Sequence, residues 1–255
     1  MTKSIVSAAA LVIGDELLSG RVRDENIQEI ANLCVEAGIE LCEVRIVADQ
    51  QSQIVEAVNS LRKNHDYVFT SGGIGPTHDD ITADAIAVAF GVDLPVSNEA
   101  KAIIEKKYGK VDFTPEKLRM ARIPVGASLI ENVVTGAPGF KIENVHVMAG
   151  VPIIMRAMLE SIAPTLKGGK KMLCRSVDVG VGESEIAKGL GEIQEQYSDV
   201  KIGSYPKMGE KPVYTQIVLR SCLPLLLDEA TQKVQDIVDN AHRIKNINLE
   251  RVDPD

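Results

Sequence analysis

The feature that most constrains the fold is a glycine-rich run between a short apolar stretch and a segment with helical periodicity. The run reads Thr70-Ser71-Gly72-Gly73-Ile74-Gly75-Pro76-Thr77-His78-Asp79-Asp80-Ile81-Thr82. The aromatic and β-branched residues 67–69 before it predict a buried strand, and apolar residues recur at helical spacing from Ile81 to Ala89. The run therefore predicts a tight turn from a strand into a helix, a connection typical of doubly wound α/β folds.

The same turn has the composition of an anion-binding site. Glycines let a backbone approach a ligand closely, and free N–H groups at a helix N-terminus attract anions. Asp79 and Asp80 cannot bind an anion themselves, but they can hold a divalent cation that does. The run thus predicts a metal-bridged phosphate or diphosphate. The alternative is that the glycines only close the turn and one of the aspartates caps the helix.

Two familiar phosphate-binding motifs do not fit this run. A Walker A loop needs a Gly-Lys-Ser/Thr sequence, which does not follow. The dinucleotide fingerprint needs a third glycine where His78 stands.

Composition narrows the class of partner. The chain has 255 residues, 45% of them apolar, and a mean hydropathy of +0.02, which is ordinary for a soluble globular protein. Its 36 acidic and 28 basic residues give a net charge of -8, which argues against a broad nucleic-acid surface. An anionic ligand must then be held by backbone amides, a metal, or a few local basic side chains.

Cysteine spacing and hydropathy indicate a cytoplasmic protein that does not associate with membranes. The four cysteines form no Cys-x-x-Cys pair and the four histidines are scattered, so neither a structural zinc site nor a disulfide scaffold is expected. The apolar stretch 5–13 is too short to span a bilayer and lacks a signal-peptide cleavage pattern.

Residues 4–164 alternate between predicted strands and helices. The expected strands are 5–13, 39–47, 68–70, 129–134 and 145–148, and the expected helices are 26–37, 53–63, 80–90, 98–108, 115–122 and 153–162. Such alternation predicts a mostly parallel sheet covered by helices on both faces. In these sheets ligands bind beyond the carboxyl ends of the strands.

From about residue 172 onward, the order of predicted strands and helices changes. Strand-like segments 173–179, 200–205 and 213–219 and helical segments 183–196 and 224–241 predict a small βαββα domain. We therefore expect a first domain at 1–167, a second at 172–246, and a polar tail at 247–255, with the boundary in the glycine- and lysine-bearing stretch 167–171.

Acidic residues follow several of the predicted strands. Asp15 and Glu16 follow the first, Asp49 follows the second, and Asp79 and Asp80 follow the third. Parallel neighbouring strands would bring all five carboxylates to one edge of the sheet. They would repel one another unless a metal or a basic ligand group lay among them. The alternative is that some cap helices and others are merely solvated. Asp49, taken by itself, fits a helix cap as well as it fits a site residue.

Four motifs together resemble the molybdopterin-binding MogA/MoaB family, in the acid-pair form found in CinA, the competence- and damage-inducible branch. They are the run 71–82, Gly14-Asp15-Glu16-Leu17-Leu18-Ser19-Gly20, Thr135-Gly136-Ala137-Pro138-Gly139-Phe140 and Gly150-Val151-Pro152. The N-terminal domain of eukaryotic FAD synthases is related. The resemblance covers residues 4–165 closely, and the trailing βαββα unit is similar to the small second domain of CinA.

The resemblance implies a three-layer α/β fold and hydrolysis of a diphosphate bond in ADP-ribose- or FAD-like nucleotides. Asp80, with Asp15, Glu16 or Asp79, would bind Mg²⁺, Mn²⁺ or a similar divalent metal, and Asp49 would act as a base. The phosphate-binding and wall residues would be Gly72, Gly73, Gly75, Thr77, Thr82, Gly136 and Gly139.

Two other functions stay open at this stage. One is a binding module that holds a pterin or nucleotide without converting it, and the other is adenylyl transfer to molybdopterin in molybdenum cofactor biosynthesis. Relatives also imply a homo-oligomer, a dimer or trimer. The chain ends before the nicotinamide-nucleotide amidase domain of long-form CinA proteins, so we expect that activity to be absent.

Overall fold

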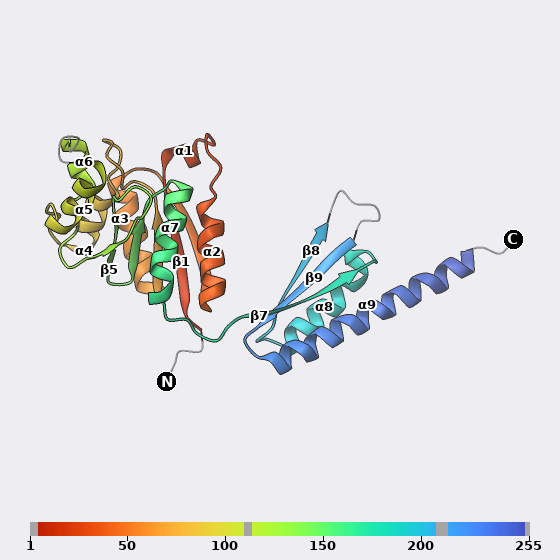
Figure 1. Ribbon diagram of the computed structural model, residues 1–255. Coiled ribbons are helices and arrows are strands. Elements are labelled where there is room, and N and C mark those ends of the chain that lie inside the picture. The colour runs from red at the N-terminus through yellow and green to blue at the C-terminus, as the bar shows by residue number, and fades with distance from the viewer. Residues whose placement is uncertain (1–4, 110–113, 208–213, 253–255) are drawn as a thin grey trace. The chain divides into compact units, whose positions relative to one another are not determined.

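The computed structural model describes residues 5–109, 114–207 and 214–252. The chain divides into two compact units, Met1–Gly169 and Lys170–Asp255 (Figure 1). The larger unit contains β1 (Ser7–Ile13), α1 (Asp15–Leu18), α2 (Asn26–Ala37), β2 (Glu40–Val47), α3 (Gln51–Asn64), β3 (Tyr67–Ser71), α4 (Thr82–Phe90), α5 (Asn98–Tyr108), α6 (Pro115–Arg119), β4 (Ser128–Ile130), β5 (Gly139–Ile142), β6 (Val145–Met148), α7 (Pro152–Ile162) and the 3-10 turn Ala163–Thr165.

A six-stranded, mostly parallel sheet forms the centre of the larger unit. The strand order is β2-β1-β3-β6-β5-β4. The first four strands are parallel neighbours, whereas β5 pairs antiparallel with β6 and with β4. The predicted α/β class with a mostly parallel sheet is confirmed. Because the parallel strands point the same way, the loops after β1, β2, β3 and β6 leave from one edge.

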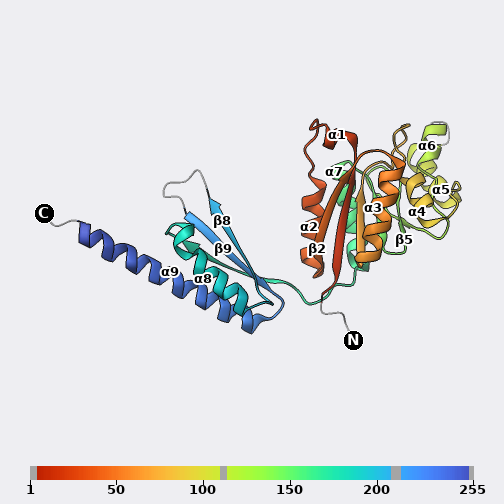
Figure 2. The ribbon, with the colours of Figure 1, turned by 180° about the vertical axis from the view of Figure 1, so that it is seen from behind.

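Helices cover both faces of this sheet, which gives three layers (Figures 1 and 2). On one face, Leu11 and Val147 belong to a core that includes residues of α3, α4 and α5. On the other, Ala10 and Phe69 pack with residues of α2 and α7. Strands buried on both faces read as continuous apolar runs, and residues 8–13 of β1 are all buried.

The main departure from the predicted elements lies between residues 128 and 142. The predicted strand 129–134 ends at Ile130, and the strand β5 was not predicted. Asn132 explains the early end, because its side-chain Oδ1 accepts hydrogen bonds from the amides of Val134 and Thr135. Those amides are therefore used locally and cannot extend the sheet.

The smaller unit is an antiparallel sheet with two helices. It contains β7 (Leu173–Val179), α8 (Glu183–Gln196), β8 (Lys201–Lys207), β9 (Tyr214–Ser221) and α9 (Pro224–Val252), with strand order β7-β9-β8. Residues of α8 and α9 share a core with buried side chains of the strands. Helix α9 continues to Val252 through most of the segment expected to be a polar tail. The other end of that prediction, residues 253–255, and the predicted strand start at Val213 lie outside the described residues.

The described residues contain no helix that is a candidate for crossing a membrane. None of the helices in the described part of the chain combines the length and apolarity that a bilayer crossing requires.

A histidine in the centre of the sheet is buried without hydrogen-bonding partners. His146 of β6 has no exposed surface, and neither ring nitrogen has a partner among the described residues. Its ring lies 5.3 Å from that of Phe69 and 5.9 Å from that of Tyr67. Burial, together with the charge of Lys141, lowers the pKa of His146 to about 4. The imidazole is therefore neutral in the folded protein at neutral pH.

This histidine should make the larger unit sensitive to acid. The unfolded chain binds the proton near its ordinary pKa of 6.5 and the folded chain near 4. The contribution of His146 to the free energy of unfolding is therefore fully present above pH 6.5. Roughly 3 kcal/mol of it is lost as the pH drops to 4. His146→Phe should remove this part of the slope in chemical denaturation measured across that range.

The control is His78→Gln, because the His78 side chain is 98% exposed. That variant should keep the slope of the wild type. A His146→Phe slope equal to that of the wild type would contradict the assignment.

Candidate functional site

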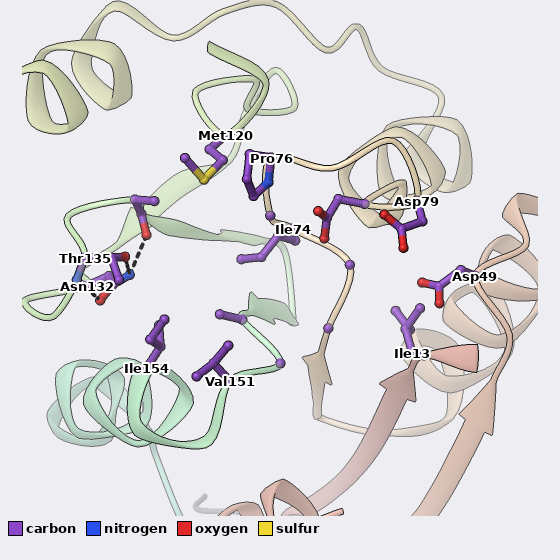
Figure 3. A pocket seen from close by; sticks show the side chains of 18 of the residues that line it. Ile13, Asp49, Ile74, Pro76, Asp79, Met120, Asn132, Thr135, Val151 and Ile154 are labelled. Carbon is purple, nitrogen blue, oxygen red and sulfur yellow. Dashed lines mark hydrogen bonds between the residues drawn. The ribbon is translucent and has the colours of Figure 1, made fainter. Parts of the chain in front are cut away.

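A cavity of about 550 Å³ opens at the carboxyl edge of the parallel strands (Figure 3). Ile13 and Gly14 from the end of β1, Asp49 after β2, and the turn from Gly72 to Pro76 after β3 line it. Residues 149–151 after β6 complete this side. Its volume lies within the range of small-molecule sites, and its position is the one that the alternating pattern predicts.

The glycine turn is held tightly by its neighbours. The Gly72 amide donates to the Met148 carbonyl (3.1 Å). Thr82 at the start of α4 donates from its hydroxyl to the Gly72 carbonyl (3.0 Å) and from its amide to the Gly73 carbonyl (2.9 Å). Gly72 and Gly73 have φ angles of 109° and 67°, a region that favours glycine. A Cβ at Gly72 would also collide with the carbonyl oxygen of Ile13.

These bonds use the carbonyl groups of the turn and leave amides free. The N–H groups of Gly73 and Gly75 have no protein acceptor among the residues that the structure describes. Both residues line the cavity and are only partly buried. The turn therefore presents backbone donors, the groups that bind phosphate oxygens at strand–helix connections.

Asp80 is fixed beside this turn. Its Oδ2 accepts hydrogen bonds from the Thr77 amide (2.7 Å) and from the Thr77 hydroxyl. A Cβ at Gly75 would lie 2.6 Å from the same oxygen, so glycine at 75 lets the carboxylate pack against the turn. The carbonyl of Asp80 accepts a hydrogen bond from Arg119 Nη2 (3.0 Å). Asp80 is thus positioned from both its side chain and its backbone.

A reciprocal pair of hydrogen bonds joins the loops after β1 and β2. The Asp15 amide donates to Asp49 Oδ2 (3.0 Å), and the Asp49 amide donates to Asp15 Oδ1 (3.4 Å). Asp49 and Asp79 lie near each other at one end of the cavity (Figure 3). Burial is the largest cause that raises the pKa of Asp49, and the charges of Asp15, Glu16 and Asp79 raise it further. Negative charge therefore accumulates at this end of the cavity.

The donor set at this acidic end fits a hard cation such as Mg²⁺ or Mn²⁺, because every candidate ligand is a carboxylate oxygen. No group of three or more His, Cys, Asp or Glu side chains that could hold a metal occurs among the described residues. A protein cage made from Asp15, Glu16, Asp79 and Asp80 is therefore not preformed. Mg²⁺ commonly takes one or two carboxylates and completes its shell with water and ligand phosphates, so the residues still suit such an ion.

The opposite wall of the cavity combines the loop of the predicted motif 135–140 with residues that the sequence did not indicate. The buried Asn132 donates from Nδ2 to Thr135 Oγ1 (2.6 Å) and to the Ala137 carbonyl (2.8 Å). Met120 and Ile154 add an apolar surface at this end (Figure 3). A hydrogen-bonded loop with apolar neighbours can hold a ring at the end opposite the carboxylates.

A cation also lines the cavity. The Nζ of Lys117 lies 4.4 Å from the centre of the Tyr108 ring, and both residues face this space. They come from α6 and α5, the helices that interrupt the strand–helix alternation. That interruption is the one sequence signal that could have pointed to them.

The predicted site residues separate into three groups. Those lining the cavity are Glu16, Asp49, Gly72, Gly73, Gly75, Asp79 and Asp80. Asp15 and Thr77 lie outside the lining and bind Asp49 and Asp80. Thr82, Gly136 and Gly139 are buried behind it, and Thr82 uses its hydroxyl on the Gly72 carbonyl.

Comparison with protein families gives two matches. Residues 9–168 match a family model described as a probable molybdopterin binding domain. Residues 171–246 match the model of the FAD synthase middle domain.

Individual proteins are also similar to this chain. A protein of Archaeoglobus fulgidus is 34% identical over 198 residues, which cover 77% of this chain and 84% of the relative. A crystal structure of CinA from Thermoplasma acidophilum, described as having unknown function, is 35% identical in sequence to this chain and superimposes with a TM-score of 0.61. The match covers 64% of this chain and 99% of that chain. A probable FAD synthase of Caenorhabditis briggsae is 28% identical over 84% of this chain and 46% of its own length.

The electrostatic coupling at the acidic end can be measured directly. Asp79→Asn should lower the pKa of Asp49, because it removes one of the charges that raise it. Burial should still keep the pKa of Asp49 above its ordinary value of 3.8. Carboxyl-carbon NMR titration of both proteins measures this directly.

Asp93→Asn is the matched control, because Asp93 is an exposed residue of the larger unit and is not among the charges that raise the pKa of Asp49. It should leave the Asp49 titration unchanged. A pKa of Asp49 that is unchanged or raised in Asp79→Asn would contradict the proposed coupling.

Proposed function

Because the chain belongs to the probable molybdopterin binding domain family, in its CinA-like form, we propose that it is a metal-dependent pyrophosphatase. Its substrate would be a nucleotide with a diphosphate bridge, of the ADP-ribose or FAD type. One observation carries the proposal. Free amides of Gly73 and Gly75 and the carboxylates of Asp49, Asp79 and Asp80 line the same cavity.

The glycine turn would bind one phosphoryl group of the bridge. The N–H groups of Gly73 and Gly75 are donors without a protein acceptor among the described residues. The bond from the Thr82 hydroxyl to the Gly72 carbonyl holds the peptide unit that carries the Gly73 N–H. Donors that are oriented before the reaction stabilise charge that develops on phosphoryl oxygens. The turn would thus contribute to binding and to the transition state.

Asp80, with Glu16 or Asp79, would hold the divalent ion. When bound, the ion neutralises charge on the phosphoryl oxygens and lowers the pKa of a bound water. Asp80 retains its Oδ1 for this purpose, because Thr77 is bound to Oδ2.

Asp49 would accept the proton of the attacking water. A carboxylate whose pKa is raised by burial and by neighbouring charges is a stronger base than an ordinary aspartate. A new bond would form between the water oxygen and one phosphorus, and the bond from that phosphorus to the bridging oxygen would break. The products would be two phosphate monoesters, AMP and ribose 5-phosphate in the case of ADP-ribose.

A second candidate is a module that binds a nucleotide or pterin without converting it. The absence of a preformed three-residue metal group in the described part of the chain favours it. The hydrolase is preferred because Asp49, a carboxylate whose pKa is raised, lines the same cavity as the free amides and can serve as a base, which binding alone does not require.

The test is incubation of purified protein with ADP-ribose, FAD or NAD and each of several divalent metals, with AMP measured by chromatography. AMP release that depends on metal supports the pyrophosphatase. Binding without turnover in all combinations supports the module. ATP consumption that requires molybdopterin would instead support adenylyl transfer.

Asp80→Asn should abolish turnover and leave the fold intact. Its amide oxygen can still accept from Thr77, but the side chain loses the charge that holds a cation. We expect a fall in kcat/KM of about a hundredfold or more, since metal stabilisation of a phosphoryl transition state is worth several kcal/mol. Steady-state kinetics and thermal unfolding measure the two effects separately.

Asp93→Asn serves as the control, because Asp93 is exposed and does not line the cavity among the described residues. It should retain wild-type turnover. Full activity of Asp80→Asn would show that the ion is held elsewhere.

A further inference from the structure

Strand β2 lies at the edge of the six-stranded sheet, with β1 as its single neighbour among the described strands. The N–H of Gly14 donates to the Val47 carbonyl, so the backbone groups of Val47 face β1. Successive residues of a strand direct these groups alternately to its two sides. Those of Val44 and Ile46 therefore point away from β1, and they have no backbone partner beyond the β1–β2 ladder in the described part of the chain.

This edge also exposes apolar side chains. Val44 and Ile46 are 40% and 42% exposed, and Cys42 is exposed as well. Proteins commonly protect an edge strand with a bulge or with charges, because its open backbone groups can pair with another chain. The pairing of β2 with β1 has one irregularity, at Cys42, but it is regular from Glu43 to Val47. The regular part remains available as a template for a further strand.

The sequence of β2 is complementary to itself when it is read in the opposite direction. Residues 41–47 are Leu-Cys-Glu-Val-Arg-Ile-Val. If two copies pair antiparallel with Val44 opposite Val44, Glu43 of each copy lies opposite Arg45 of the other, and every remaining pair is apolar. Moving the centre to either neighbouring residue places Glu43 opposite Glu43 or Arg45 opposite Arg45. Like charges directly opposite destabilise a strand pair, so charge selects the register centred on Val44.

The two charged residues already lie together on one face of β2. Arg45 Nε is 2.6 Å from Glu43 Oε1, and Arg45 Nη2 donates to Ser60 Oγ of α3 (3.0 Å). Glu43 Oε2 is 3.3 Å from His65 Nε2. The side chains of Arg45 and Glu43 are still 34% and 37% exposed, so each presents part of its surface to a second chain. Two copies would bring four charges of alternating sign together.

We propose that two copies of this chain pair antiparallel through β2, about a two-fold axis at Val44, and so join their six-stranded sheets into one. The Val44 N–H of each copy would donate to the Val44 carbonyl of the other. Such an interface uses the same surface on both copies, so the assembly closes as a dimer. The inference does not depend on the proposed function, because no residue of 41–47 lines the cavity.

The test uses charge reversals, which alter the register without removing apolar surface. Sedimentation of the full chain over a range of micromolar concentrations gives its mass in solution, and the wild type should be a dimer. Arg45→Glu and Glu43→Arg should each raise the dissociation constant about tenfold or more, because each variant opposes two like-charge pairs across the axis.

An equal mixture of these two variants should recover a dimer that contains one chain of each kind. Two acidic positions of one chain then lie opposite two basic positions of the other. The bond between Glu43 and Arg45 within a chain is lost in both variants. Recovery on mixing therefore reports contacts between chains and cannot arise from repair of the single chain.

The controls are Glu99→Arg and Lys106→Glu, which make the same charge changes at exposed positions of α5. Helix α5 lies away from β2 within the larger unit (Figure 2), so both controls should keep the wild-type dimer. If a single reversal does not fold, the double variant Glu43→Arg/Arg45→Glu decides, because it keeps opposite charges within the chain. It should pair with itself and not with the wild type.

The other results overturn the inference. These are a wild type that is a monomer or a trimer, a dimer that is unaffected by both reversals, and variants that stay monomeric when mixed. A double variant that fails to pair with itself also overturns it. Recovery of the mixed dimer supports the inference whether or not the protein hydrolyses ADP-ribose, so the two proposals can fail separately.

Discussion

The hydrogen bonds that fix the glycine turn after β3 determine which backbone groups the turn presents to the cavity. The carbonyls of Gly72 and Gly73 are bound by Thr82, and the Gly72 amide is bound by Met148. With these groups in use, the peptide units that follow Gly72 and Gly73 cannot rotate to offer their carbonyls to the cavity, and the N–H groups of Gly73 and Gly75 have no protein acceptor among the described residues. The turn therefore presents donors, and a ligand with acceptor oxygens is the complement.

Parallel pairing of β1, β2, β3 and β6 supplies the rest of the geometry. Each of these strands ends at the same edge, so loops distant in the sequence meet there. The reciprocal bonds between Asp15 and Asp49 join two of these loops, and Asn26 joins the loops at Ser71 and Gly150. The loops are thus linked by side chains as well as by the sheet. Linked loops lose less freedom when a ligand binds, which favours affinity.

The sequence predicted the sheet, its class and the acidic end, because each depends on a local signal combined with one topological rule. Runs of apolar residues predict buried strands, and the meeting of carboxyl ends then brings Asp49 close to Asp79. The assignment of individual roles to these residues stays a prediction.

The side-chain contacts that build the wall opposite the carboxylates could not be predicted in the same way. Asn132 reads as one residue in a β-branched stretch, yet its side chain captures two amides and turns the chain. Asn26 reads as an ordinary helix start, and its importance lies in contacts to residues 45 and 124 positions away along the chain. Lys117 and Tyr108 come from helices outside the alternating pattern. In all these cases the decisive contact is made by a side chain whose partner the sequence does not reveal.

Charge balance gives the strongest reason to expect a cation with the ligand. Four carboxylates and one ammonium group line the main cavity among the described residues, and an anionic diphosphate would add to the excess. Neither Arg119 nor Arg122 lines this cavity. Arg122 forms a two-fold pair with Asp84 (2.7 and 2.8 Å), and Arg119 is bound to the Asp80 carbonyl. The backbone donors of the turn carry only partial charges. On the proposed function, a divalent ion bound with the diphosphate would offset this excess of negative charge, and Asp80 would be among the residues that hold it.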